Sequence, residues 1–197
     1  MLFYIEWLAV ALGIINVGLL VRRSIWNYPF GIAMVCLYFV IFTDARLYGD
    51  AGLQVFFLLT QIYGWISWNK VRGQMGDVVV QWSGAGLVLA VLAATSIATL
   101  ALGFAMERFT DAAAPYPDAA IAAFSVTAQV LMVLRRIESW IYWIAVDVLA
   151  IWLFWTRDLA PTSGLYAVFL LLAIAGLWQW LKAHKAQNSP QPRAGMA

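Results

Sequence analysis

The chain has 197 residues, of which 64% are hydrophobic and only 11% are charged. Its mean hydropathy of +0.82 leaves too few polar side chains to cover a water-soluble globule, which excludes a soluble domain. Twelve Lys and Arg against ten Asp and Glu give a net charge of +2. This near balance argues against a nucleic-acid-binding protein, which carries a clustered basic face. The composition therefore predicts an integral membrane protein.

Apolar runs of the length that crosses a bilayer, roughly 20 residues, follow one another along the chain. The fifth and sixth runs are separated only by Arg135-Arg136-Ile137-Glu138-Ser139, which is either a tight turn or a polar break in one kinked helix. Their combined length is too great for a single crossing. The sequence therefore predicts seven transmembrane helices in one domain over residues 1–185, followed by a disordered tail at 186–197. The seven runs lie at residues 5–21, 25–43, 51–69, 84–106, 117–134, 140–156 and 163–181.

Basic residues are distributed unevenly between alternate loops. One side of the membrane would receive three of them, Arg46, Arg108 and Arg157. The positive-inside rule therefore predicts an outer N-terminus and a cytoplasmic C-terminus. The other side would receive nine, which are Arg22, Arg23, Lys70, Arg72, Arg135, Arg136, Lys182, Lys185 and Arg193.

The third and seventh runs share an internal repeat. A unit of three helices ends on the opposite side of the membrane from where it begins, so the run 84–106 is needed to restore the direction of a second, parallel unit. This pattern predicts a 3+1+3 parallel-repeat arrangement, as in SWEET-type carriers, with repeats at 5–69 and 117–181 around the linking helix. At a constant offset of 112, the residues Leu53, Phe57, Leu58, Leu59, Ile62, Gly64 and Trp68 match Leu165, Phe169, Leu170, Leu171, Ile174, Gly176 and Trp180.

Polar side chains inside a bilayer are costly, so their positions are the best indication of a functional site. Three runs each carry such side chains along one helical stripe. Together the amides, carboxylates and indoles predict a cavity for a flat, polar, cationic molecule, because aromatic faces attract cations. The stripes are Gln54, Gln61, Trp65 and Trp68 on the third run, Asp118, Ser125 and Gln129 on the fifth, and Trp140, Trp143 and Asp147 on the sixth.

Several of these residues have an ordinary structural explanation as well. Trp65 lies near a span end, where interfacial anchoring is common, and Gln61 and Gln129 can hydrogen-bond between helices. Asp118 follows two prolines and can cap a helix. Asp147 is different, because it lies at mid-depth with no Lys or Arg in its own span, so we expect it to supply the counter-charge for a cation.

Missing motifs narrow the class of protein further. The sequence contains no GxxxxGK[ST] loop and no HExxH motif, and it has one His and one Cys. Nucleotide hydrolysis through a P-loop, metal chemistry and His-based nucleophilic catalysis are therefore not expected. We expect neither an enzyme nor a bound cofactor.

Two stretches resemble the PnuC family of bacterial vitamin transporters. They are "WNYPFGIAMVCLYFVIFTDARLYGDAGLQVFFLLTQIYGWISW" from Trp26 to Trp68 and "QVLMVLRRIESWIYWIAVDVLAIW" from Gln129 to Trp152. The resemblance extends from about residue 7 to 182. It implies a seven-helix protein of the bacterial inner membrane with SWEET-like organisation. It also implies uptake of nicotinamide riboside by facilitated diffusion, with intracellular phosphorylation trapping the product.

The resemblance also assigns roles to the stripe residues. Trp140 and Trp143 correspond to the tryptophan motif of the sixth helix, and Asp147 to the amide-or-acid position one turn later. Gln54, Gln61 and Gln129 lie in the polar motifs of the third and fifth helices. Ser139 departs from the pattern, because members often have Asn there.

Two alternatives remain at the level of the sequence. Sister branches carry thiamine, riboflavin or deoxynucleosides, so thiamine is the alternative substrate, and a ligand-binding membrane sensor is the alternative without transport. The expected partners are a small cationic vitamin, the lipid bilayer and further copies of the chain, with a trimer as the candidate homo-oligomer. No nucleic acid is expected.

Overall fold

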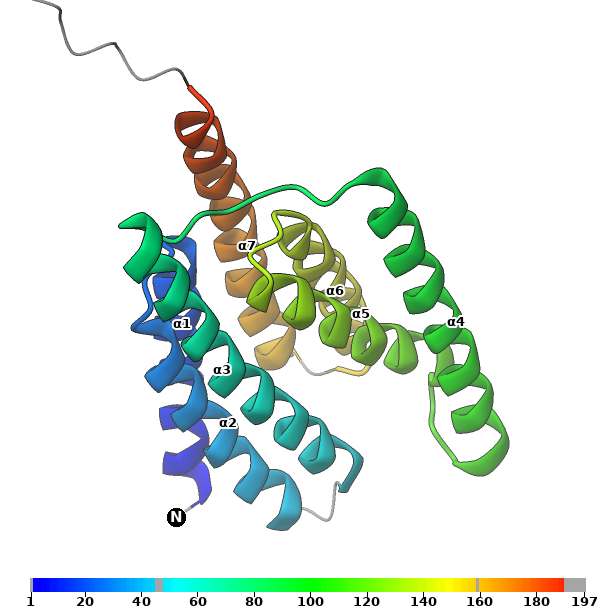
Figure 1. Cartoon of the computed structure of the whole chain (residues 1–197). Helices are drawn as coiled ribbons and strands as arrows, with labels where there is room; N and C mark the ends of the chain where they lie inside the picture. Colours follow the sequence, from blue (N-terminus) through cyan, green and yellow to red (C-terminus); the bar gives the residue numbers. More distant parts are fainter. Residues whose placement is uncertain (1, 45–47, 159, 190–197) are drawn as a thin grey trace, which may run out of the picture.

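The computed structural model describes residues 2–44, 48–158 and 160–189, and these residues are almost entirely helical (Figure 1). The expectation of a tail at 186–197 falls largely on residues 190–197, which lie outside the described ranges. The described part contains seven helices, as predicted: α1 (Leu2–Val21), α2 (Asn27–Asp44), α3 (Tyr48–Met75), α4 (Ala85–Phe109), α5 (Pro115–Val133), α6 (Glu138–Thr156) and α7 (Ala160–Gln187).

Six of these helices are long and apolar enough to cross a membrane. The helix outside this set is α3, which carries Gln54 and Gln61 in its first half and the charged residues Asp50, Lys70 and Arg72 toward its ends. Polar groups are costly in a bilayer unless they face the interior of the protein. The low hydropathy of α3 therefore indicates a helix whose polar stripe faces its neighbours.

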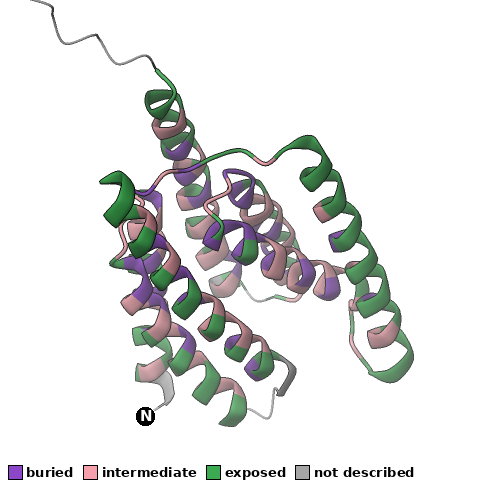
Figure 2. Cartoon of the chain, viewed as in Figure 1, coloured by how far each residue is buried: buried purple, intermediate pink, exposed green. Residues whose placement is uncertain are grey.

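The helices are arranged as a closed ring with one helix outside it. Around the ring, α1 packs against α2, α2 against α3, α3 against α5, α5 against α6, α6 against α7, and α7 against α1. The remaining helix, α4, packs on the outside of α5 and stands apart from α1, α2 and α3 (Figure 1). Its surface is largely exposed (Figure 2), which suits a helix surrounded by lipid.

The fifth and sixth apolar runs are separate helices joined by a tight turn. Arg135 has a left-handed backbone with φ of 59°, and its N–H donates to the Met132 carbonyl at 2.9 Å. The turn after α1 is built in the same way, because Arg23 has φ of 56° and its N–H donates to the Leu20 carbonyl at 2.9 Å. Partial burial lowers the pKa of the Arg135 guanidinium below its ordinary value.

The same offset of 112 residues that relates the repeated sequence motifs also relates helix ends and packing contacts. Both ends of α3 correspond to both ends of α7 at this offset. A Cβ on Gly64 would lie 2.6–2.9 Å from the Tyr28 ring, and one on Gly176 would lie 2.5–2.6 Å from the Trp140 ring. Each glycine therefore makes room for the aromatic ring of a neighbouring helix at an equivalent position.

An aromatic core joins the two halves of the chain at one end of the ring. The Trp68 indole N–H donates to the Val133 carbonyl at 3.1 Å, and the Trp180 indole N–H donates to the Leu20 carbonyl at 3.2 Å. The two indoles are 5.9 Å apart. Tyr28 meets Trp68 edge-on at 5.4 Å, and Trp140 meets Trp180 edge-on at 5.6 Å. Such pairs contribute about 0.5–1.5 kcal/mol each beyond burial.

The connection from α3 to α4 crosses this end of the ring as a strap, which we define as residues 77–83 (Figure 1). Val78 and Val80 of the strap are buried in the aromatic core. The Arg23 guanidinium holds the strap through an ion pair with Asp77 at 3.0 Å and a hydrogen bond to the Val78 carbonyl at 2.9 Å. The strap therefore seals the aromatic core at the end of the ring where α3, α5 and α7 finish.

Candidate functional site

Four of the predicted site residues are buried polar side chains in the ring helices. Gln54 and Gln61 of α3, Gln129 of α5 and Asp147 of α6 are 4% to 9% exposed. Within the described ranges, none of these four side chains has a hydrogen bond or ion pair to another residue. Their polar atoms are also not among those that are completely buried without a hydrogen-bond partner, so they keep some accessible surface. Because buried polar groups are nearly always hydrogen-bonded, these four side chains are the candidates for binding water or a ligand.

Asp147 lies at the middle of α6, one turn after Trp143. Tyr166 of α7 is within electrostatic range of Asp147, and also of Tyr38 on α2 and Asp50 on α3. Trp143 is partly buried and packs against the aromatic core, one helical turn before Asp147.

Trp140 lies about 10 Å along the helix axis from Asp147, given a rise of about 1.5 Å per residue. It is only 1% exposed, and its ring packs over Gly176 and edge-on against Trp180. Its indole nitrogen is buried without a hydrogen-bond partner among the described residues. In this arrangement Trp140 forms the packed wall at one end of the candidate site.

Gln61 of α3 faces α1 and α2. Its amide lies against Gly31 of α2, where any larger residue would collide with it. The Asn16 amide of α1 lies against the same glycine and donates to the Asn27 carbonyl at 2.7 Å. Asn16 was not among the predicted site residues, although an amide within the first apolar run meets the criterion that selected the glutamines.

The other two predicted site residues lie in different surroundings. Asp118 is partly exposed in the first turn of α5 and forms an ion pair with Arg157 at 2.9 Å. Arg157, the residue directly after α6, was not predicted to have this role. Trp65 is 37% exposed, on the same stripe of α3 as the buried glutamines. In the described part of the chain, no three His, Cys, Asp or Glu side chains form a cluster that could hold a metal ion.

A ring of membrane helices that buries unpartnered amides and a carboxylate is typical of a membrane transport protein for a small polar solute. The comparisons with known proteins identify the family. The family model for the nicotinamide mononucleotide transporter matches residues 3–182, so the chain belongs to this family. It is therefore a multi-pass inner-membrane transporter and not an enzyme, as the resemblance to the PnuC family implies.

Individual relatives share most of the chain. It is 25% identical over 213 residues to the nicotinamide riboside transporter PnuC of Escherichia coli, covering 95% of this chain and 89% of the relative. It is 26% identical over 185 residues to the riboflavin/roseoflavin transporter RibM of Streptomyces davaonensis, covering 91% and 85%. A crystal structure of the vitamin B3 transporter PnuC matches with a TM-score of 0.76 and 28% identity, covering 93% of this chain and 83% of that one.

Proposed function

We propose that this transporter takes up nicotinamide riboside by facilitated diffusion, and that intracellular phosphorylation traps the product. The observation that carries the proposal is Asp147, a buried carboxylate at mid-helix with no partner among the described side chains. An unpaired buried carboxylate is costly, and a bound pyridinium cation would neutralise it. A phosphorylated mononucleotide would instead bring further negative charge to the same place.

The proposed contacts follow from the placement of the side chains. Trp143 would stack on the pyridinium ring while Asp147 supplies the counter-charge, and Trp140 would form the wall behind them. Gln54, Gln61 and Gln129 would bind the ribose hydroxyls and the carboxamide, because amides both donate and accept hydrogen bonds. Asp118 and Trp65, which are partly exposed, would contact the substrate on its way to or from this position.

We further propose the 3+1+3 arrangement, with parallel repeats at about 5–69 and 117–181 and a linking helix at about 84–106. The offset of 112 residues, the matched contacts of the two turns and the position of α4 outside the ring support it. The two repeats would rock against each other around the site and expose it to one side at a time. The excess of basic residues on one side supports an outer N-terminus and a cytoplasmic C-terminus.

The decisive experiment compares nicotinamide riboside, thiamine and riboflavin on the purified full-length chain. Calorimetry in detergent measures binding, and uptake into proteoliposomes measures transport. We expect binding and uptake of the riboside without thiamine binding. A preference for thiamine would move the substrate assignment to that vitamin, and binding without flux would indicate a sensor.

The same proteoliposomes test the mechanism. Facilitated diffusion predicts that internal riboside reaches but never exceeds the external concentration, with or without an imposed proton or sodium gradient. Accumulation driven by either gradient would instead show coupled transport. Native mass spectrometry of the preparation tests the proposed homo-oligomer, for which we expect a trimer.

A further inference from the structure

The two halves of the ring, α1–α3 and α5–α7, meet along two seams, which are α1 with α7 and α3 with α5. Several hydrogen bonds between the halves lie at the end of the ring that the strap crosses, which we call the strap end. The indoles of Trp68 and Trp180 each donate to a carbonyl of the opposite half, and the Arg135 guanidinium donates to the Ser67 hydroxyl at 3.0 Å. These bonds must break if the halves separate at this end.

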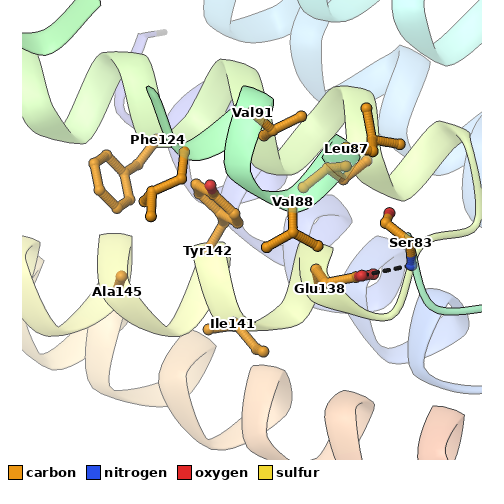
Figure 3. Close-up of a pocket in the computed structure, with 11 residues that line it drawn as sticks. Ser83, Leu87, Val88, Val91, Phe124, Glu138, Ile141, Tyr142 and Ala145 are labelled. Carbon is orange, nitrogen blue, oxygen red and sulfur yellow. Dashed lines mark hydrogen bonds between the residues drawn. The ribbon is translucent and has the colours of Figure 1, made fainter. Parts of the chain in front are cut away.

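The strap is hydrogen-bonded mainly to the second half. Gln81 pairs with the turn between α5 and α6, because its N–H donates to the Arg135 carbonyl and its carbonyl accepts from the Ile137 N–H, each at 3.1 Å. The Ser83 N–H donates to Glu138 Oε1 at 2.6 Å, beside an apolar cavity between α4, α5 and α6 (Figure 3). Further contacts to the strap come from the side chains of Arg136, His184 and Gln187.

Arg23, in the turn after α1, is the side chain of the first half that holds the strap. Its Nη1 pairs with Asp77 Oδ2 at 3.0 Å and donates to the Val78 carbonyl at 2.9 Å. The Asp77 side chain is 63% exposed, so water screens the ion pair. Val78 is buried in the aromatic core, so the bond to its carbonyl is the stronger of the two contacts.

Gly76 joins α3 to the strap. It has a left-handed backbone with φ of 77°, and a Cβ at this position would meet nothing within 4 Å. A glycine in open space at the end of a helix can absorb a change of backbone direction at low cost. The covalent link between the first half and the strap can therefore bend at Gly76, whereas the Arg23 contacts restrain the same segment from the side.

We propose that the contacts of Arg23 with Asp77 and Val78 hold the strap end of the ring closed. This inference rests on the proposed rocking of the two halves, but not on the identity of the substrate. When the strap end opens, the Arg23 contacts break, the chain bends at Gly76, and the strap stays on the second half. Loss of these contacts therefore shifts the equilibrium toward the form that is open at the strap end, on the proposed cytoplasmic side.

The test is cysteine accessibility in right-side-out and inside-out membrane vesicles, measured with a membrane-impermeant maleimide. Ala173→Cys reports on the strap end, because Ala173 is buried in the aromatic core, and Cys36→Ser removes the native cysteine. On this background, Arg23→Gln should raise the labelling rate from the strap side about tenfold, the factor that one hydrogen bond to a charged group contributes. Asp77→Asn should raise it about two- to fivefold, because it removes only the partly exposed ion pair.

The matched controls are Arg22→Gln and Asp118→Asn. Arg22 precedes Arg23 in the chain but is exposed, and Asp118 pairs with Arg157 within the second half. Neither substitution should change the labelling rate. Arg23→Lys keeps the positive charge and should restore part of the wild-type protection.

Hydrogen exchange of the strap at residue resolution needs no introduced cysteine. The amides of Gln81 and Ser83 should stay protected in Arg23→Gln, because their acceptors belong to the second half. The Val78 amide donates only to Asp77 of the strap itself, so it should exchange faster in this variant.

Unchanged labelling in both Arg23→Gln and Asp77→Asn would overturn the proposal. An equal rise in Arg22→Gln, or a rise from both sides of the membrane, would indicate general loosening and would overturn it as well. Loss of protection at Gln81 and Ser83 would show that the strap leaves the second half, which contradicts the proposal. If Ala173→Cys does not fold, the exchange measurement decides the question. None of these measurements uses a substrate, so a wrong substrate assignment would not alter their results.

Discussion

Replacing Asp147 with Asn tests the electrostatic role at the centre of the proposed site. The substitution is nearly isosteric, so it leaves no cavity and removes only the charge. Asp147 is 4% exposed, and no described Lys or Arg pairs with it, so the carboxylate is available to a cation. A cation about 4 Å away would gain roughly 4 kcal/mol at an effective dielectric constant of about 20. Desolvation of both ions offsets part of this gain.

The net value of a hydrogen bond to a charged group is about 1.5–3 kcal/mol. Asp147→Asn should therefore weaken binding of nicotinamide riboside by about 10- to 150-fold, at about 1.4 kcal/mol for each factor of ten. Isothermal calorimetry on the purified variant measures this directly, and proteoliposome uptake should fall in parallel. Trp65→Phe on the partly exposed part of α3 is the control, and it should change both quantities much less.

The chemically reduced riboside, which has the same shape but no positive charge, separates charge from shape. Asp147→Asn should bind this neutral ligand at least as well as the wild-type chain does. Equal and negligible effects of Asp147→Asn and Trp65→Phe on the cation would refute the roles proposed for these residues. An equal loss for the charged and the reduced ligand would refute the electrostatic argument.

Three further substitutions test the framework around the site. Gly176→Ala should lower the unfolding free energy by about 1–3 kcal/mol, because the new methyl group collides with the Trp140 ring; Gly164→Ala on the same helix meets nothing and should be neutral in the same denaturation assay. Trp180→Phe should cost about 0.5–1.5 kcal/mol by removing one of the two hydrogen bonds that the Leu20 carbonyl accepts, and calorimetric melting should show no such loss for the exposed Trp178→Phe. Asp118→Asn breaks a partly exposed ion pair and should cost less than about 1 kcal/mol, so a large loss of stability in denaturant would contradict that estimate.

The two halves of the chain have identical residues at equivalent packing positions but different residues at the positions of the proposed substrate site. At the offset of 112, Trp68 and Gly64 in the first half match Trp180 and Gly176 in the second. Four of the site residues have no such counterparts. Asp147 corresponds to Val35, Trp143 to Gly31, Gln129 to Val17 and Gln61 to Ala173. The first half thus supplies Gln54 and Gln61, and the second half supplies Gln129, the carboxylate and the indole, so the proposed site needs both.

The number and limits of the helices could be read from the sequence. A bilayer sets a nearly constant length for an apolar span, so hydrophobic runs and the charges between them located all seven helices to within a few residues. The exceptions are α3 and α7, whose C-terminal ends extend beyond the predicted spans. The 3.6-residue period is also a local property. It placed Gln54, Gln61, Gln129 and Asp147 on stripes, and the structure shows all four buried.

Only the tertiary structure decided which side chains meet. Asp118 pairs with Arg157 across 39 residues, and Trp68 donates to a carbonyl 65 residues away. It also decided that Trp140 packs into the aromatic core and that Glu138 ends at a cavity beside α4. Such contacts depend on which helices become neighbours and how closely glycines let them approach. Hydrophobic periodicity determines which face of each helix is buried, but it does not determine which other helix packs against that face.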